Sequence, residues 1–239
     1  MVLGKDVSEY VGLGLAIAII ALWFSSGIFC ITQPDLSPWQ IAIGIAIRTF
    51  LHTGLFILAH DSMHGSLVPN SPPINKFFGQ FTVGLYACLS YKRCAHQHQL
   101  HHLQPAQQGD PDFHDGIHTH PIHWYFHFLR HYFSLRQFSL FLGVVLSATL
   151  IFHHFLNATY LSLITYFLLP LLFSSLQLFI FGTYLPHRQG TNTAKPTPLP
   201  HSLRYLWSLI SCYHFGLYHQ EHHASPYKPW FRLPLSSTS

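Results

Sequence analysis

The sequence predicts an all-helical integral membrane protein with two transmembrane hairpins and a histidine-rich cytoplasmic cap. Of its 239 residues, 49% are hydrophobic and only 8% are charged, whereas a soluble domain carries roughly 25% charged residues. Long uncharged segments alternate with segments rich in histidine, which occurs 21 times. Because so few polar groups are available to cover a water-facing surface, we expect the chain to fold in a bilayer, as one domain over residues 1–239.

Four apolar segments are long enough to cross a hydrocarbon core of about 30 Å. They cover residues 11–31, 39–59, 138–155 and 160–184. Turn-forming residues at 33–38 and 156–159 join them in pairs, which predicts two hairpins. The first segment is longer than the apolar core of a secretory signal and has no small-residue cleavage site after it, so we interpret it as a membrane span.

Three features interrupt these segments. Arg48 and His52 lie within the second one, and ionisable groups inside a membrane normally face protein, so both are expected to point inward. Pro170 lies within the fourth segment and is expected to kink the helix and to free the carbonyl of Tyr166. Residues 77–89 are apolar but too few for a full span, which favours a re-entrant or interfacial piece.

The distribution of basic residues predicts the orientation. If both hairpin turns lie outside, every Lys and Arg except the intramembrane Arg48 lies inside, and the two turns carry none. We therefore expect both termini on the cytoplasmic side. The net charge of +4 comes from 12 Lys and Arg residues spread along the chain, which does not indicate a nucleic-acid partner.

The histidines form three clusters with regular spacing. They are His60 and His64, then His98, His101 and His102, and finally His219, His222 and His223. Helical positions i, i+3 and i+4 share one face, so each cluster presents its imidazoles side by side. Eight imidazoles exceed what one tetrahedral or octahedral ion can use, so two metal ions are predicted. The predicted topology brings all three clusters to the cytoplasmic side.

The composition narrows the class of metalloprotein. Two glutamates are too few for a carboxylate-bridged four-helix di-iron protein, and the H-E-x-x-H motif of zinc proteases is absent. The four cysteines contain no C-x-x-C pair, which argues against thiolate ligands. Two metals held in a membrane by neutral imidazoles suggest iron that activates dioxygen and removes hydrogen from an unactivated C–H bond.

The three histidine clusters after membrane hairpins resemble those of the integral-membrane fatty acid desaturase and hydroxylase superfamily. Within it, residues 53–65, 110–114, 181–187 and 212–223 resemble the β-carotene 4-ketolases, and the likeness runs from about residue 39 to residue 234. The resemblance implies two Fe²⁺ ions, dioxygen as co-substrate and an electron donor such as reduced ferredoxin. It also implies a carotenoid substrate, whose C4 ring methylene becomes a ketone, as in the conversion of β-carotene to echinenone and canthaxanthin.

The resemblance adds further candidates for the site. Related oxygenases take one more histidine from the stretch after the last span, and His187 matches that position as a ninth ligand. Asp61 and Asp112 are candidates to orient ligand imidazoles, or else are exposed capping residues. His214 is a candidate for either a ligand or a supporting role, and the crowded second cluster leaves the role of His96 open.

Other functions stay open at this point. A carotenoid 3-hydroxylase or a fatty acyl desaturase of the same superfamily fits the clusters equally well. A haem b electron carrier would use paired histidines inside the membrane, and a metal transporter would place its site near the bilayer midplane. Here the clusters follow the spans, which disfavours both.

Overall fold

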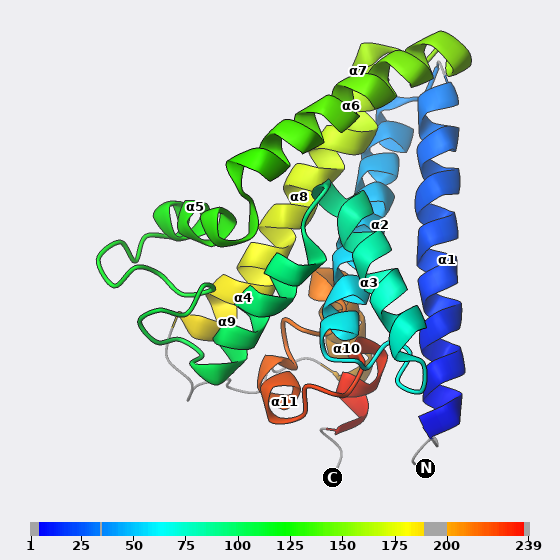
Figure 1. The fold of residues 1–239 in the computed structure, drawn as a ribbon. Coiled ribbons are helices and arrows are strands. Elements are labelled where there is room, and N and C mark those ends of the chain that lie inside the picture. Colours follow the sequence, from blue (N-terminus) through cyan, green and yellow to red (C-terminus); the bar gives the residue numbers. More distant parts are fainter. Residues whose placement is uncertain (1–4, 34, 189–199, 237–239) are drawn as a thin grey trace.

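The computed structural model describes residues 5–33, 35–188 and 200–236, and all regular structure within these ranges is helical. Within them, four helical segments are long and apolar enough to cross a membrane, namely Ser8–Thr32, Pro38–Met63, Leu135–Leu156 and Tyr160–His187. They form two hairpins (Figure 1). The predicted fold class is confirmed, and each helix extends somewhat beyond the uncharged segment that predicted it.

The first hairpin consists of α1 (Lys5–Thr32) and α2 (Pro38–Met63). Ser37 and Gln40 form a reciprocal capping box at the start of α2, which satisfies amide groups that a helix leaves unpaired at its N-terminus. The helix then continues past the predicted end at residue 59 through the first histidine cluster. His60 lies in its last turn and His64 is its C-cap, so both imidazoles are carried by the end of a rigid span.

A shorter helical hairpin follows, made of α3 (Pro72–Ala87) and α4 (Tyr91–Leu103). It includes the predicted re-entrant piece, but its first helix begins at Pro72 rather than at residue 77, because proline fits the first turn of a helix. Helix α3 runs back along α2, and a Cβ at Gly79 would lie 2.2 Å from Ser62 Oγ. Only glycine permits this close contact between α2 and α3. Helix α4 then runs back beside α3 (Figure 1).

The second hairpin begins after α5 (Pro121–Tyr132) and consists of α6 (Leu135–Leu156) and one long helical run. That run comprises α7 (Tyr160–Leu163), η1 (Ile164–Leu168), α8 (Leu169–Gln177), η2 (Leu178–Tyr184) and α9 (Leu185–His187), of which η1 and η2 are π-helical. The last described elements are α10 (His201–Cys212), the short α11 (His219–Ala224) and the 3₁₀ segment η3 (Trp230–Ser236).

An intramembrane arginine joins the two hairpins. Arg48 is fully buried, as predicted, and its Nε donates to the carbonyl oxygen of Tyr166 at 3.0 Å. Pro170 has no N–H to bond that carbonyl, so the proline leaves an acceptor that the guanidinium satisfies. Another guanidinium N–H donates to the carbonyl oxygen of Trp23 in α1. One side chain thus ties α1, α2 and the π-helical turn η1 together.

The other predicted inward group links the first hairpin to α3. His52 is 4% exposed, and its Nδ1 accepts a hydrogen bond from Trp23 Nε1 at 3.1 Å. In that tautomer the Nε2–H donates to the carbonyl oxygen of Tyr86 at 2.9 Å. Both ring nitrogens are therefore satisfied by protein, which fixes α3 against the helix that carries His60 and His64.

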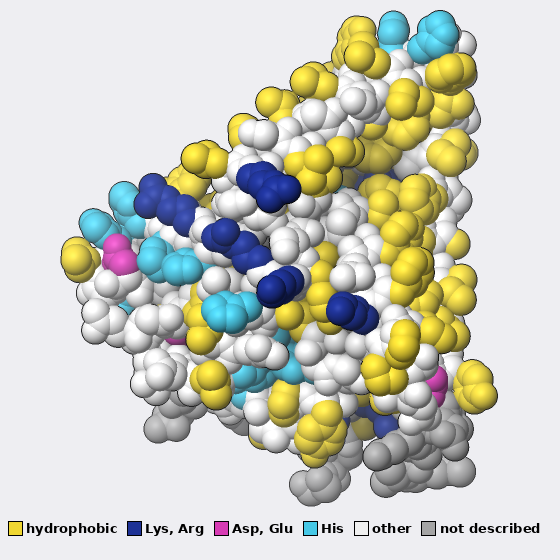
Figure 2. Space-filling view, in the orientation of Figure 1, with side chains coloured by type: hydrophobic (Ala, Val, Ile, Leu, Met, Phe, Trp, Pro, Cys, Tyr) yellow, Lys and Arg dark blue, Asp and Glu magenta, His cyan; other side chains and the backbone are white. Residues whose placement is uncertain are grey.

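The two hairpin turns meet at one end of the molecule. Cys30 and Ile31 at the end of α1 pack with Ala158 in the turn before the fourth span and with Leu163 in the first helical turn of that span. Helices α11 and η3 and the start of α1 lie at the opposite end (Figure 1). Hydrophobic side chains dominate the α6 edge in Figure 2, whereas Lys and Arg form a band across the middle of that face. This separation fits a molecule embedded in lipid on the side of the turns.

Candidate metal centre

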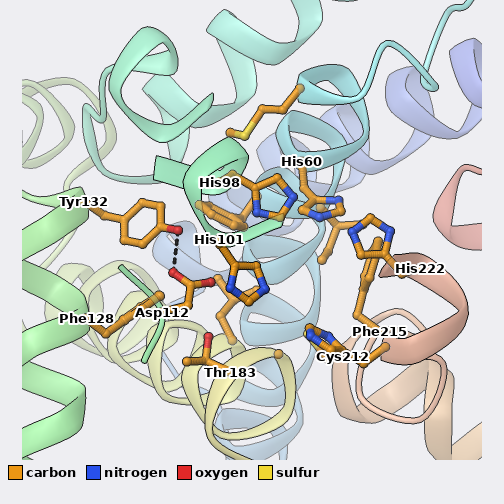
Figure 3. A pocket seen from close by; sticks show the side chains of 16 residues that line it. His60, His98, His101, Asp112, Phe128, Tyr132, Thr183, Cys212, Phe215 and His222 are labelled. Atoms are coloured by element: carbon orange, nitrogen blue, oxygen red, sulfur yellow. Dashed lines mark hydrogen bonds between the residues drawn. The ribbon is translucent and has the colours of Figure 1, made fainter. Parts of the chain in front are cut away.

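The structure brings all nine predicted ligands together in two groups. The first group is His60, His64, His98, His102 and His222; the second group is His101, His187, His219 and His223. Within each group, one ring nitrogen from every member lies within 4.8 Å of the others. The rings come from α2, α4, α9 and α11, and those lining the cavity are drawn in Figure 3.

The spacing of the clusters explains how two groups arise from three motifs. On α4, His98 and His102 are one turn apart and join the first group, whereas His101 is rotated away from them and joins the second. On α11 the assignment is mirrored, with His222 in the first group and His219 and His223 in the second. Each H-x-x-H-H motif therefore spans both groups and holds them side by side.

The ring nitrogens are spaced as ligands of one ion would be. In the first group the Nε2 atoms of His64 and His98 are 2.7 Å apart, and His102 Nε2 lies 3.1 Å from His98 and 3.0 Å from His222. Metal–nitrogen bonds of about 2.1 Å place neighbouring ligand atoms roughly 3.0–3.4 Å apart in octahedral or tetrahedral shells. A neutral imidazole has one lone pair and one N–H, so several imidazoles cannot all satisfy one another by hydrogen bonds. A metal ion that accepts a lone pair from each ring can bind them together.

The second group has the same spacing. His223 Nε2 lies 3.0 Å from the Nε2 atoms of both His101 and His219, and His219 Nε2 lies 3.1 Å from that of His187. The Nδ1–H of His187 donates to the carbonyl oxygen of Thr183 at 2.6 Å, one turn earlier in the helix. This bond fixes the tautomer and aims the lone pair on Nε2 into the group.

Burial favours the neutral form of most of the clustered imidazoles, whereas the neighbouring carboxylates of Asp112 and Asp110 outweigh burial and raise the pKa of His101. Burial, together with the neighbouring imidazoles, lowers the pKa of His102 to about 3 and that of His223 to about 2. Burial likewise holds the pKa of His222 well below the ordinary value. Only a neutral imidazole has a lone pair for a metal ion, so these rings are prepared to act as ligands at neutral pH.

A buried carboxylate supports the second group. Asp110 is 2% exposed, and both of its carboxylate oxygens lie 3.0 Å from Nδ1 of His101, which donates to them. The same carboxylate accepts from the backbone N–H groups of Ala106 and Asp112, both at 2.8 Å. Asp110 therefore orients His101 and shapes the loop after α4. It lies within the motif at residues 110–114, but the sequence alone did not single it out.

The carboxylates named from the sequence have different partners. Asp112 does not orient an imidazole but accepts a hydrogen bond from Tyr132 Oη at 2.6 Å. Asp61 Oδ1 is 3.5 Å from His60 Nδ1, while its Oδ2 accepts from the backbone N–H of Trp230 at 3.0 Å. Both carboxylates are buried, so the alternative of exposed capping residues is wrong.

His214 and His96, whose roles the sequence did not determine, lie outside both groups. His214 is fully buried, but its Nδ1 bonds Ser208 Oγ at 2.7 Å and its ring stacks on Trp230. It supports the turn between α10 and α11 rather than joining a group. His96 is exposed on α4.

An apolar cavity opens beside the two groups. A chamber of about 60 Å³ adjoins five of the nine imidazoles and is otherwise lined mostly by hydrophobic residues, with Asp112, Tyr132 and Thr183 as polar exceptions (Figure 3). A larger chamber of about 260 Å³ lies among α2, α3, α5, α6 and α8. The two share the side chains of Phe56, Phe128, Tyr132 and Leu178 and therefore adjoin.

The fold and the centre define a class of integral-membrane protein whose histidine groups are compatible with iron. Residues 36–237 match the family model for fatty acid desaturase, and the chain belongs to that family. Within it, the chain is homologous to beta-carotene ketolases. It is 38% identical to the beta-carotene ketolase of Paracoccus sp. (strain PC1), over 97% of this chain and 94% of that protein.

Two further relatives extend this comparison. The beta-carotene ketolase of Paracoccus sp. (strain N81106 / MBIC 01143) is 37% identical over 94% of this chain and 87% of its own length. The zeaxanthin 4-ketolase of Chlamydomonas reinhardtii is 32% identical over 95% of this chain and 53% of its own length.

We predict that Asp110→Asn weakens metal binding by about 10- to 100-fold, because the charged acceptor that orients His101 becomes neutral. Metal content per chain, measured after equilibration at fixed free Fe²⁺ concentrations, checks this. Asp115→Asn is the matched control, since Asp115 also bonds a histidine, His118, but on the exposed surface. Equal metal affinities for the two variants would contradict a supporting role for Asp110.

Proposed function

We propose that the chain is an oxygen-dependent di-iron carotenoid ketolase that converts the C4 methylene of a β-ionone ring to a ketone. The observation that carries this proposal is the meeting of nine imidazoles, in two groups, beside an apolar cavity. The names of the relatives, beta-carotene ketolase and zeaxanthin 4-ketolase, support the substrate class and the reaction.

The nine histidines of the two groups are the proposed ligands of two iron ions. When bound, two iron ions would activate dioxygen for the oxidation of an unactivated C–H bond, with electrons from a donor such as reduced ferredoxin. The protein favours the neutral form of most of the imidazoles and fixes two of them through Asp110 and Thr183. It also surrounds the reaction site with apolar side chains that exclude water.

The larger chamber is the proposed route of the substrate. Apolar side chains line it, and Phe138 and Leu172 on its wall are 50% and 47% exposed, on the side of the molecule where α6 presents apolar residues. A hydrocarbon dissolved in the bilayer can enter there without crossing water. It reaches the smaller chamber at the side chains that the two chambers share.

The other candidate functions are less well supported. A haem needs two imidazoles on opposite faces of a flat ring, whereas four or five imidazoles converge in each group. A 3-hydroxylase or an acyl desaturase is compatible with the same ligands, and the product of the reaction distinguishes them. Ketolase relatives that align over nearly all of this chain favour ketone formation.

We predict that cells that make β-carotene accumulate ketones when they express this chain. Each modified ring gains one oxygen and loses two hydrogens, and absorption moves to longer wavelength because the carbonyl extends the conjugated system. Alanine at any one of the nine histidines abolishes the product, because both metal ions need their ligands. Mass and absorption spectra of extracted pigment measure this outcome.

His154→Ala is the control for these variants, since His154 is exposed beside the turn after α6 and belongs to neither group. It should leave the yield of ketone unchanged. A hydroxylated product without the spectral shift would favour the hydroxylase, and altered fatty acids with untouched carotene would favour the desaturase. Ketone formation that persists without dioxygen contradicts the mechanism.

We also propose that both termini and the histidine groups face the cytoplasm. The four native cysteines are free and can be replaced without loss of a disulfide. In that background, an impermeant thiol reagent added to intact cells should label Asp35→Cys but not Gln107→Cys; both positions are exposed in the fold. Permeabilised cells should show labelling at both. Labelling of Gln107→Cys from outside would reverse the orientation.

A further inference from the structure

A buried polar pair stands between the two chambers. Tyr132 Oη donates to Asp112 Oδ1 at 2.6 Å, and the side chains belong to residues that are only 6% and 7% exposed. Both line the smaller chamber, and Tyr132 also lines the larger one. In Figure 3 the pair lies on one side of the chamber, with His101 in the middle and His60 and His222 on the far side.

The pair is held in place from several directions. The backbone N–H of Asp112 donates to Asp110 at 2.8 Å, and the backbone carbonyl of Asp112 accepts from Trp124 Nε1 at 2.9 Å. Trp124 and Tyr132 both belong to α5, so this helix hydrogen-bonds the loop that carries Asp112 at two points. The hydrogen-bonding atoms therefore have fixed positions relative to the carboxylate that orients His101.

The pair also has unused capacity to bond a ligand. Within the described part of the chain, no hydrogen bond reaches the second carboxylate oxygen, Oδ2 of Asp112. Tyr132 Oη donates its proton and keeps a lone pair. Because Asp112 lines the chamber, a hydroxyl group that enters the chamber can donate a hydrogen bond to its Oδ2. A pure hydrocarbon ring offers none.

The proposed reaction creates such a hydroxyl group. Each hydroxylation consumes one dioxygen, two electrons and two protons, inserts one oxygen atom into a C–H bond and releases one water. After two such steps at one carbon, the geminal diol loses water and leaves a ketone. The intermediate after the first step is a ring alcohol, which must stay in place for the second.

We propose that Asp112 and Tyr132 are positioning residues that hold this ring alcohol for the second oxidation. The alcohol donates to Asp112 Oδ2 or Tyr132 Oη, which delays its release and keeps the same carbon beside the histidine groups. The pair thereby directs the enzyme toward a ketone instead of an alcohol. This inference rests on the proposed function and adds to it the residues that select the product.

The test compares two Tyr→Phe variants at buried positions. Tyr132→Phe removes a hydroxyl from the pair, whereas Tyr213→Phe removes one that lies outside both chambers and donates to the carbonyl oxygen of Phe50 at 3.1 Å. Both are expressed in cells that make β-carotene, and early samples give the ratio of C4 alcohol to ketone. We expect Tyr132→Phe to raise this ratio by about tenfold while carotene consumption stays within about threefold of wild type. Tyr213→Phe leaves the ratio unchanged.

Asp112→Asn provides a second variant that replaces a carboxylate oxygen by an amide and should shift the ratio in the same direction. An unchanged ratio in a variant with wild-type iron content overturns the inference, as does a parallel loss of alcohol and ketone. If neither variant retains iron, the pair supports the metal centre instead, and the inference is also wrong. Absence of any C4 product from the wild-type chain would instead overturn the proposed function.

Discussion

The convergence of nine imidazoles at one end of a helical bundle is the constraint on which the rest of the structure depends. Each ring must arrive with a lone pair directed inward and with its other nitrogen satisfied or buried. Splitting each H-x-x-H-H motif between two groups meets this requirement with only two short helices, α4 and α11. The helical hairpin of α3 and α4 brings the second histidine cluster back to the end of α2.

The membrane adds a second requirement, because polar groups in the spans must find protein partners. Pro170 leaves the Tyr166 carbonyl without its usual donor, and Arg48 satisfies it. His52 similarly binds Trp23 on one side and Tyr86 on the other. These bonds lock three spans and α3 together, and they keep the end of α2 at a fixed place in the centre. The polar residues of the spans therefore support the site without being part of it.

Much of this arrangement follows from spacing alone. Absence of charge over long segments predicts the four spans, and i, i+3, i+4 spacing predicts which imidazoles share a face. Sequence cannot show which of two neighbouring carboxylates reaches a ring, because Asp110 and Asp112 differ only in how the loop folds back on α5. It likewise left His214 undecided, since only the turn after α10 reveals that this ring bonds Ser208. The start of α3 at Pro72 was missed because the residues before 77 are polar.

Iron K-edge X-ray absorption on the purified chain, together with a count of iron per chain, tests the central claim most directly. The account predicts two iron ions per chain, each surrounded by nitrogen and oxygen atoms with metal–nitrogen distances of about 2.1 Å and without sulfur. A single iron with the strong visible absorption of haem would contradict it. So would a sulfur shell, or a folded chain that binds no iron at all.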